Sequence, residues 1–245
     1  MLIEIDTHCH SVASTHAYST VKELATSAKE NGLKGFALTD HAPASPDSPH
    51  IWHFHNLKCL PKEINGVRLL LGAEANIIDT EGNLDLDYRE LCHLQWVIAS
   101  FHTPVVNYGT YDDFTRAYIN IAKNHELVDV IGHCTTDSFP FDYELVLKYF
   151  KEYEKLVEIN ESSIMNKNGS RENSYTILKL CKKYEVPIVV NTDCHYCDLI
   201  GKVPESEKMI NSLNFPKELI LNSDFDRFME YVTKKEDKYY SYNNG

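Results

Sequence analysis

The sequence predicts an α/β barrel built around a parallel sheet. Short apolar runs rich in β-branched residues alternate with amphipathic helical patterns, which is typical of repeated βαβ units. The alternation extends over 245 residues with 43% hydrophobic residues, enough for one large α/β domain. Polar residues that can bind metals lie at or just past the ends of the apolar runs. Because an α/β barrel builds its active site from strand ends that meet at one rim, we expect these residues to converge.

Seven apolar runs are predicted to form the strands of the sheet. They span residues 2–6, 34–39, 67–74, 96–101, 128–132, 156–160 and 187–192. Helices are predicted at residues 20–31, 56–63, 88–94, 111–125, 142–154 and 171–185, with two more near 204–213 and 223–234. Pro187 can open the last strand, where its missing N–H costs least.

Several predicted helices carry start signals beyond periodicity. Thr20 with Glu23 and Thr110 with Asp113 have the spacing of a capping box. Pro204 suits the first turn of a helix, because its fixed φ and missing N–H are tolerated there. The helix predictions therefore rest on two independent kinds of evidence.

Two stretches do not fit the alternation. Residues 42–56 contain three prolines and three histidines and are too long for an ordinary βα connection, which indicates a loop folded over the site. Residues 234–245 are polar and have no apolar face. We therefore predict a single barrel domain over residues 1–233 and a polar C-terminal tail over residues 234–245.

Composition excludes some classes of function. A formal charge of −12 argues against an extended nucleic-acid-binding face, which needs clustered lysine and arginine. No signal peptide is evident and no apolar run approaches the roughly 18 residues of a membrane span, so we expect a cytoplasmic protein without membrane attachment. The seven cysteines lack the spacing of a disulfide scaffold and are predicted to be reduced. A homo-oligomer is compatible with the sequence.

Nine side chains at the strand ends are candidate metal ligands. They are His8, His10, His16, His41, Glu74, His102, His133, Asp193 and His195. Side chains alternate between the faces of a strand, so His8 and His10 point the same way and Cys9 points away. Asp193 and His195 repeat this spacing. Independently placed structural histidines explain one or two such positions far better than the whole set.

The donor types indicate which metals the site would bind. Imidazole with carboxylate oxygen suits Zn²⁺, Fe²⁺ or Mn²⁺, whereas Mg²⁺ and Ca²⁺ prefer nearly all-oxygen shells. Nine ligands exceed two closed tetrahedral sites once positions are reserved for water and substrate. We therefore expect two or three divalent ions, zinc first and manganese or iron next. Asp6 and Asp40, close before His8 and His41, could orient these imidazoles, and Asp40 could equally be an ordinary turn residue.

The same residues resemble those of a known family. The chain resembles the PHP (polymerase and histidinol phosphatase) family over nearly its whole length, and residues 14–20, 52–54, 72–76 and 158–163 resemble its small bacterial branch in particular. The resemblance implies a metal-dependent phosphatase on a distorted (β/α)7, TIM-like barrel, with a trinuclear metal site at the C-terminal rim of the strands.

The resemblance also implies a ligand set for each ion. His8, His10, Glu74 and Asp193 would hold the first ion; Glu74, His102 and His133 the second; and His16, His41 and His195 the third. The sequence departs from the family at Cys134, where relatives often have proline, and at Cys194, commonly serine or alanine. Cys9, Cys134 and Cys194 therefore put three thiols beside the rim, where they could tune the choice of metal or merely fill space.

The activity expected from this resemblance is hydrolysis of a small phosphomonoester. A hydroxide formed from water shared by two ions would attack phosphorus in line with the leaving oxygen, and no separate side chain is assigned as catalytic. Lys167 or Arg171 could clamp phosphate oxygens, and His53 with Trp52 could contact substrate from the long loop. All four also have an ordinary interpretation as solvated surface residues.

Two other classes of function fit parts of the sequence. An amidohydrolase-like C–N or C–O hydrolase would share the paired histidines and the late aspartate, but the usual carbamylated lysine is not visible. A metal-storage or sensing protein without turnover would normally close its coordination shells, whereas these residues are predicted on an open rim. The loops show no base or sugar motif that would identify the leaving group, and histidinol phosphate is not favoured.

Overall fold

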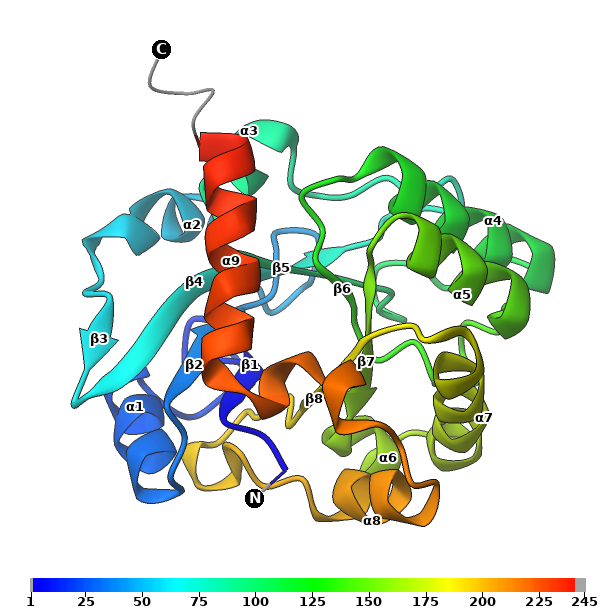
Figure 1. The fold of residues 1–245 in the computed structure, drawn as a ribbon. Coiled ribbons are helices and arrows are strands. Elements are labelled where there is room, and N and C mark those ends of the chain that lie inside the picture. Colours follow the sequence, from blue (N-terminus) through cyan, green and yellow to red (C-terminus); the bar gives the residue numbers. More distant parts are fainter. Residues whose placement is uncertain (1, 241–245) are drawn as a thin grey trace.

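The parallel strands occur around the sheet in the order in which they occur in the chain. The computed structural model describes residues 2–240, and within them the order is β1-β2-β4-β5-β6-β7-β8. Figure 1 shows the strands at the centre of the molecule with helices around them. The strands are β1 Ile5–Cys9, β2 Gly35–Leu38, β4 Val67–Asn76, β5 Trp96–Ser100, β6 Val130–Ile131, β7 Leu156–Asn160 and β8 Ile188–Asn191, and the short β3 Glu63–Ile64 pairs antiparallel with β4.

Nine α-helices lie within the described residues, and the longer ones other than α9 lie outside the barrel. They are α1 Val21–Glu30, α2 Trp52–Asn56, α3 Tyr88–Leu91, α4 Tyr111–Asn124, α5 Tyr143–Glu152, α6 Glu161–Asn166, α7 Ser170–Tyr184, α8 Pro204–Ser212 and α9 Phe225–Tyr240. Short 3₁₀ helices occur at Leu57–Cys59, Cys197–Leu199, Lys217–Leu219 and Leu221–Ser223. None of these helices combines the length and apolar character that crossing a membrane requires.

The barrel closes differently at its two ends. At the carboxyl ends of β1 and β8, the His10 amide donates to the carbonyl of Cys194 at 3.0 Å. Lower down, the Asn222 side chain lies between these strands and donates to the carbonyls of Ile5 at 3.0 Å and Val190 at 2.7 Å. The Asn222 side chain thus replaces part of the backbone hydrogen bonding that would otherwise join β1 to β8. The prediction of a distorted barrel is confirmed.

Most predicted element positions agree with the structure, and the first strand shifts by three residues. Thr20 and Thr110 both form the predicted capping boxes. The first strand, predicted at residues 2–6, lies at Ile5–Cys9 and contains a bulge between Asp6 and Cys9. His8 therefore lies within the strand rather than after it.

Two predictions of local structure differ from the structure, and one helix was not predicted. The helix predicted at residues 56–63 ends early, because Pro61 lacks an N–H and the preceding Leu60 is extended. Helix α6 was not predicted. Helix α9 continues through residues 234–240 of the predicted tail, where Lys235 donates to the carbonyl of Leu127 at 2.9 Å. Residues 241–245 of that tail lie outside the described residues.

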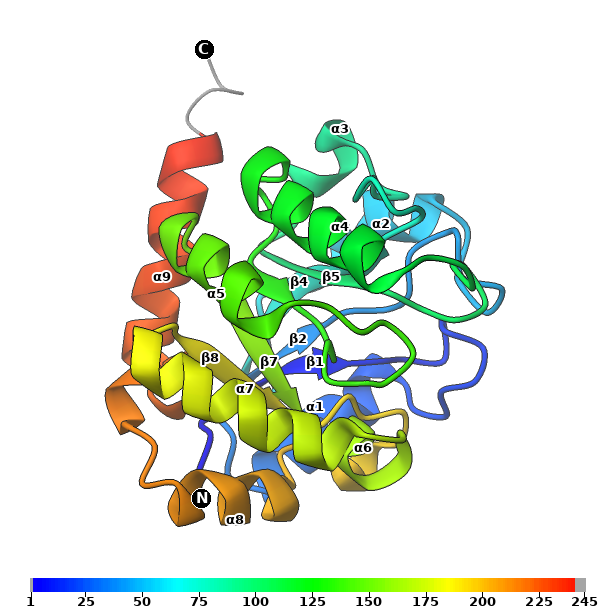
Figure 2. The ribbon, with the colours of Figure 1, turned by 90° about the vertical axis from the view of Figure 1, so that its right-hand side faces the viewer.

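The apolar core has two layers. The inner cluster fills the barrel and consists of Ile5, Ala37, Leu70, Trp96, Ile98, Val130, Leu156 and Val189 from the strands, with Phe228 and Val232 from α9. Figure 2 shows α9 on the side opposite the loops that follow the strands. Helix α9 therefore seals the amino-terminal end of the barrel and leaves the other end for the site.

The outer layer lies between the strands and the surrounding helices. Cys9, Cys134 and Cys194 are buried in this layer. Cys9 points away from the barrel interior, as its position between His8 and His10 requires. This burial supports the interpretation that the three thiols fill space.

Candidate metal centre

The nine candidate ligands lie together at the carboxyl-terminal rim of the barrel. His8 and His10 come from the end of β1, His16 from the loop after it, and His41 from just after β2. Glu74 lies near the end of β4, His102 follows β5, His133 follows β6, and Asp193 and His195 follow β8. His16 is the most exposed of the nine candidate ligands, yet its ring centroid is 4.4 Å from that of His195 and 5.3 Å from that of His41. Parallel strands thus bring residues 187 positions apart to one site.

Glu74 is fully buried at the centre of the cluster. Both of its carboxylate oxygens face imidazole nitrogens from other strands. Oε1 is 2.9 Å from His133 Nε2 and 3.3 Å from His102 Nε2, and Oε2 is 2.9 Å from His41 Nδ1, 3.3 Å from His8 Nε2 and 3.5 Å from His10 Nε2. One carboxylate can therefore serve ions on two sides.

Several donor atoms in this cluster have no hydrogen-bond partner among the described residues. The buried atoms are His8 Nε2, both ring nitrogens of His10, His41 Nδ1, Glu74 Oε2 and His195 Nε2. Their close contacts with one another lack the geometry of hydrogen bonds. A buried polar atom without a partner costs about 1–3 kcal/mol, and a native protein carries few of them. Nitrogen and oxygen lone pairs that face one another can be satisfied by a bound cation. The residues present therefore fit divalent ions that bind imidazole, such as Zn²⁺.

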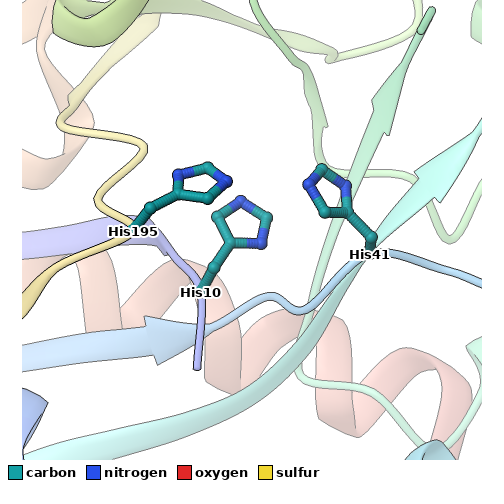
Figure 3. Close-up of side chains that lie close together, drawn as sticks. All are labelled: His10, His41 and His195. Carbon is teal, nitrogen blue, oxygen red and sulfur yellow. The ribbon is translucent and has the colours of Figure 1, made fainter. Parts of the chain in front are cut away.

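Four overlapping triplets have donor atoms close enough to share an ion. They are His8, His10 and Asp193; His10, His41 and His195; His16, His41 and Asp47; and His41, Glu74 and His102, with all donor atoms of a triplet within 4.8 Å of one another. Figure 3 shows the rings of His10, His41 and His195 directed toward a common space. Asp47, from the long loop after β2, is a candidate ligand that the sequence analysis missed.

Several imidazoles are held by a partner on the ring nitrogen that faces away from the cluster. His8 Nδ1 is 2.7 Å from Glu158 Oε1, and His102 Nδ1 is 2.8 Å from Asn76 Oδ1. His16 Nδ1 is 2.8 Å from the carboxylate of Asp47, which itself belongs to a donor triplet with His16 and His41. Such contacts fix the ring and leave Nε2 free to bind a metal.

Sequence reasoning missed these orienting roles, although Glu158 gives a signal. It is a charged residue in the middle of the apolar strand β7 and is fully buried, which is rare unless the charge has partners. Its Oε2 also accepts the amide of His133 at 2.7 Å, so one carboxylate fixes two candidate ligands.

Asp6 and Asp40 do not orient the neighbouring imidazoles. The carboxylate of Asp6 accepts hydrogen bonds from Thr192 and from the amide of Gly201, and that of Asp40 accepts from Ser11. The prediction that they orient His8 and His41 is wrong for the described contacts. Both aspartates instead tie the rim loops to the ends of the strands.

The histidines differ in their affinity for protons. Burial acts to lower the pKa of His8, but the surrounding carboxylates, Glu158 first, outweigh burial and raise this pKa well above its ordinary value. Burial lowers the pKa of His10 to about 3 and that of His133 to about 4. His10 and His133 are therefore neutral near pH 7, as metal ligands must be, and an ion would displace the proton of His8.

The carboxylates of the cluster are ionised. Burial acts to raise the pKa of Glu74 and of Asp193, but the nearby histidines, His8 first, outweigh it and hold both pKa values well below their ordinary range. The pKa of Glu158 is lowered for the same reason. The cluster therefore offers ionised oxygens beside the neutral imidazoles of His10 and His133.

Two candidate ligands have left-handed backbone conformations. His133 has a φ of 26° and Asp193 a φ of 55°. Such residues cost about 1–3 kcal/mol unless surrounding contacts hold them, and they gather at functional sites. The hydrogen bond from the His133 amide to Glu158 is one of these contacts.

The predicted substrate contacts have different environments. His53 Nε2 lies 3.2 Å from the carboxylate of Asp40, and Trp52 is exposed. The Arg171 guanidinium donates to Glu205 at 2.9 Å. Lys167, in contrast, lines a cavity that His102 also lines. The structure thus brings Lys167 to the edge of the cluster and pairs Arg171 with a carboxylate elsewhere.

Replacing Glu158 with glutamine is expected to weaken zinc binding by about 10–100-fold, because an amide cannot hold His8 as a carboxylate does. Competition with a chromophoric chelator measures this affinity. Glu161→Gln is the matched control, since the buried Glu161 accepts the amides of Glu205 and Ser206 and takes no part in the cluster. Equal zinc affinity in wild type and Glu158→Gln would contradict the orienting role.

The fold and the site together define a class: an α/β barrel with a candidate metal centre at the carboxyl ends of its strands. The family model described as PHP domain matches residues 6–244, so the chain belongs to the PHP domain family. A probable phosphatase of Acetivibrio thermocellus is 40% identical over 238 residues, 97% of this chain and 98% of the relative. A probable phosphatase of Caldicellulosiruptor saccharolyticus is 43% identical over 232 residues, 95% of this chain and 97% of the relative. The resemblance inferred from the sequence is confirmed.

A solved structure supports the fold independently. The histidinol phosphate phosphatase of Lactococcus lactis, described as complexed with zinc, L-histidinol and phosphate, has a TM-score of 0.62 at 17% identity. The match covers 88% of this chain and 95% of that one. At this identity the likeness establishes the shared barrel.

Proposed function

We propose that this protein is a metal-dependent phosphatase that hydrolyses a small phosphomonoester at a site with two or three divalent ions, zinc first. The observation that carries the proposal is the buried Glu74 carboxylate among five imidazoles, with donor atoms that lack hydrogen-bond partners. The relatives named probable phosphatases support it, as does the Lactococcus lactis enzyme in its complex with zinc and phosphate.

The proposed ligand sets follow the family resemblance, and the contacts among His8, His10 and Asp193 and among Glu74, His102 and His133 support the first two sets. One ion would be held by His8, His10, Glu74 and Asp193, a second by Glu74, His102 and His133, and a third by His16, His41 and His195. Bound ions would supply water of lowered pKa as the nucleophile and would neutralise the charge of the phosphate. Glu158, Asn76 and Asp47 would hold His8, His102 and His16 in the orientation that this chemistry needs.

The test is metal analysis of the purified protein, followed by a substrate panel with Zn²⁺, Mn²⁺ and Fe²⁺. We expect two or three ions per chain and turnover of p-nitrophenyl phosphate. Hydrolysis of amides or lactones without phosphate esters would favour an amidohydrolase-like activity. Tight stoichiometric metal uptake without any turnover would favour a storage or sensing protein.

Removal of the metals is expected to lower the melting temperature. Ions that bind only the folded state stabilise it by about 4 kcal/mol at a thousand times their dissociation constant, which corresponds to roughly 8–16 °C for a chain of this size. Calorimetry before and after dialysis against a chelator measures the shift, and added Zn²⁺ should restore it. A melting temperature that is indifferent to the chelator would contradict a loaded site.

A further inference from the structure

A cavity lies directly beside the metal centre. It is bordered by His102, Thr136, Ser138, Asn166, Lys167 and Asn168, and we call it the leaving-group cavity. We propose that it holds the part of the substrate that leaves as the alcohol, and that this part carries hydroxyl groups and a second negative charge facing Lys167. This inference rests on the proposed phosphatase function and names the class of its substrate.

His102 places the cavity beside the candidate metal centre, because this residue is both a candidate ligand and part of the cavity wall. His102 Nε2 is 3.2 Å from His133 Nε2 and 3.3 Å from Glu74 Oε1, and its ring lines the cavity. The walls come from the loops after β5 and β6 and from the turn between α6 and α7, all on the rim side in Figure 2. A phosphate held at the second ligand set would therefore lie beside this space, which has room for the group attached to its ester oxygen.

The size and walls of the cavity suit a small polar molecule. Its volume is about 380 Å³, within the roughly 300–1,000 Å³ that small-molecule pockets occupy, so it has room for more than a phosphate group. Phe101 and Phe139 line it with rings stacked at 5.0 Å. The hydroxyls of Thr136 and Ser138 and the amides of Asn166 and Asn168 add groups that recognise hydroxyl oxygens.

Lys167 gives the cavity its charge. Among the described residues that line the cavity, it alone has a fixed charge, and it makes no ion pair within residues 2–240. Nearby Arg171 and Lys208 both pair with Glu205. The net charge of the chain is −12, so a half-buried ammonium without a carboxylate partner at the site points to an anionic ligand.

The backbone holds Lys167 in place between two helices. Its amide donates to the carbonyl of Ser163 at 2.9 Å, and its carbonyl accepts the amide of Ser170 at 3.3 Å. The carboxylate of Asp137 lies in sequence between the cavity residues Thr136 and Ser138. It accepts a hydrogen bond from Asn173 at 2.9 Å and, among the described residues, forms no ion pair with Lys167.

The reaction balances without a further reactant. The oxygen of water bonds to phosphorus, the ester P–O bond breaks, and the leaving oxygen takes a proton. The products are inorganic phosphate and an alcohol that bears a second anionic group, such as a hydroxy acid. Lys167 would contact that anionic group at the far end of the leaving alcohol.

The test compares 3-phosphoglycerate with glycerol 3-phosphate, which have the same carbon chain and differ in a carboxylate at the far end. We expect the metal-loaded protein to prefer 3-phosphoglycerate in kcat/KM by about tenfold or more, as one charge-assisted contact provides. Lys167→Met should bring the ratio of the two kcat/KM values close to one. Arg171→Met is the control, because Arg171 is a nearby cation that already pairs with Glu205, and this variant should keep the wild-type ratio. Calorimetry should show that glycerate binds more tightly than glycerol to wild type but not to Lys167→Met.

Each contrary outcome has its own meaning. Hydrolysis of both phosphates at the same rate in wild type would overturn the inference and leave the phosphatase function standing. Equal losses with both substrates in Lys167→Met would assign Lys167 to the transferred phosphate and would also overturn it. If the metal-loaded protein hydrolyses neither phosphate nor p-nitrophenyl phosphate, the proposed function fails and the inference fails with it.

Discussion

Glu74→Gln is expected to lower kcat/KM for p-nitrophenyl phosphate by about a thousandfold or more, a loss of roughly 4 kcal/mol in transition-state stabilisation. The reason is the central place of this carboxylate, whose two oxygens face five imidazoles from four strand ends. Glutamine keeps the volume but removes the negative charge, so an ion bridged by Glu74 would be lost or displaced.

The measurement pairs steady-state kinetics with metal content per chain. Glu161→Gln is again the matched control, because it removes a buried carboxylate that contacts α8 rather than the candidate ligands. Full activity in a Glu74→Gln variant with a normal metal content would contradict the proposed mechanism.

Phe228→Ala should lower the free energy of unfolding by about 3–5 kcal/mol. The Phe228 side chain is fully buried, and its ring lies 5.0 Å from that of Trp96 inside the barrel. Removing it leaves a cavity where α9 seals the amino-terminal end, and the surrounding strands cannot collapse freely into that space.

Chemical denaturation measures this loss, and Phe225→Ala provides the comparison. Phe225 lies on the same helix but is only partly buried against the inner cluster, so its loss should be smaller. Zinc affinity of folded Phe228→Ala should be unchanged, because the candidate ligands lie at the other end of the barrel. A loss below about 1 kcal/mol would contradict the role of α9 as a seal.

The candidate site was predictable because parallel strands impose a rule on distant residues. Every run that ends in His, Glu or Asp delivers that side chain to the same rim, so the positions of His41, Glu74 and His133 follow from strand order alone. The same rule does not predict which residue contacts the second ring nitrogen of each histidine, the one that faces away from the site.

Pairwise partners were not predictable for a physical reason. The contact between Glu158 and His8 joins residues 150 positions apart and depends on the rotation of two strands, which local patterns do not encode. Asn222 enters between β1 and β8 from a 3₁₀ turn without any periodic signal. The helix predicted at residues 56–63 ends early for a simpler reason, because Pro61 forces the preceding Leu60 into an extended conformation.

The seam between β1 and β8 has a consequence for the order of events during synthesis. His8 and His10 precede Asp193 and His195 by more than 180 residues in the chain, so the two sides of the seam are translated far apart in time. Asn222, which joins the two strands, is translated later still. Until then both strands present unpaired edges, which are prone to wrong pairing, and closure depends on contacts of very long sequence separation. The nascent chain therefore cannot assemble the complete set of candidate ligands before His195 has been translated.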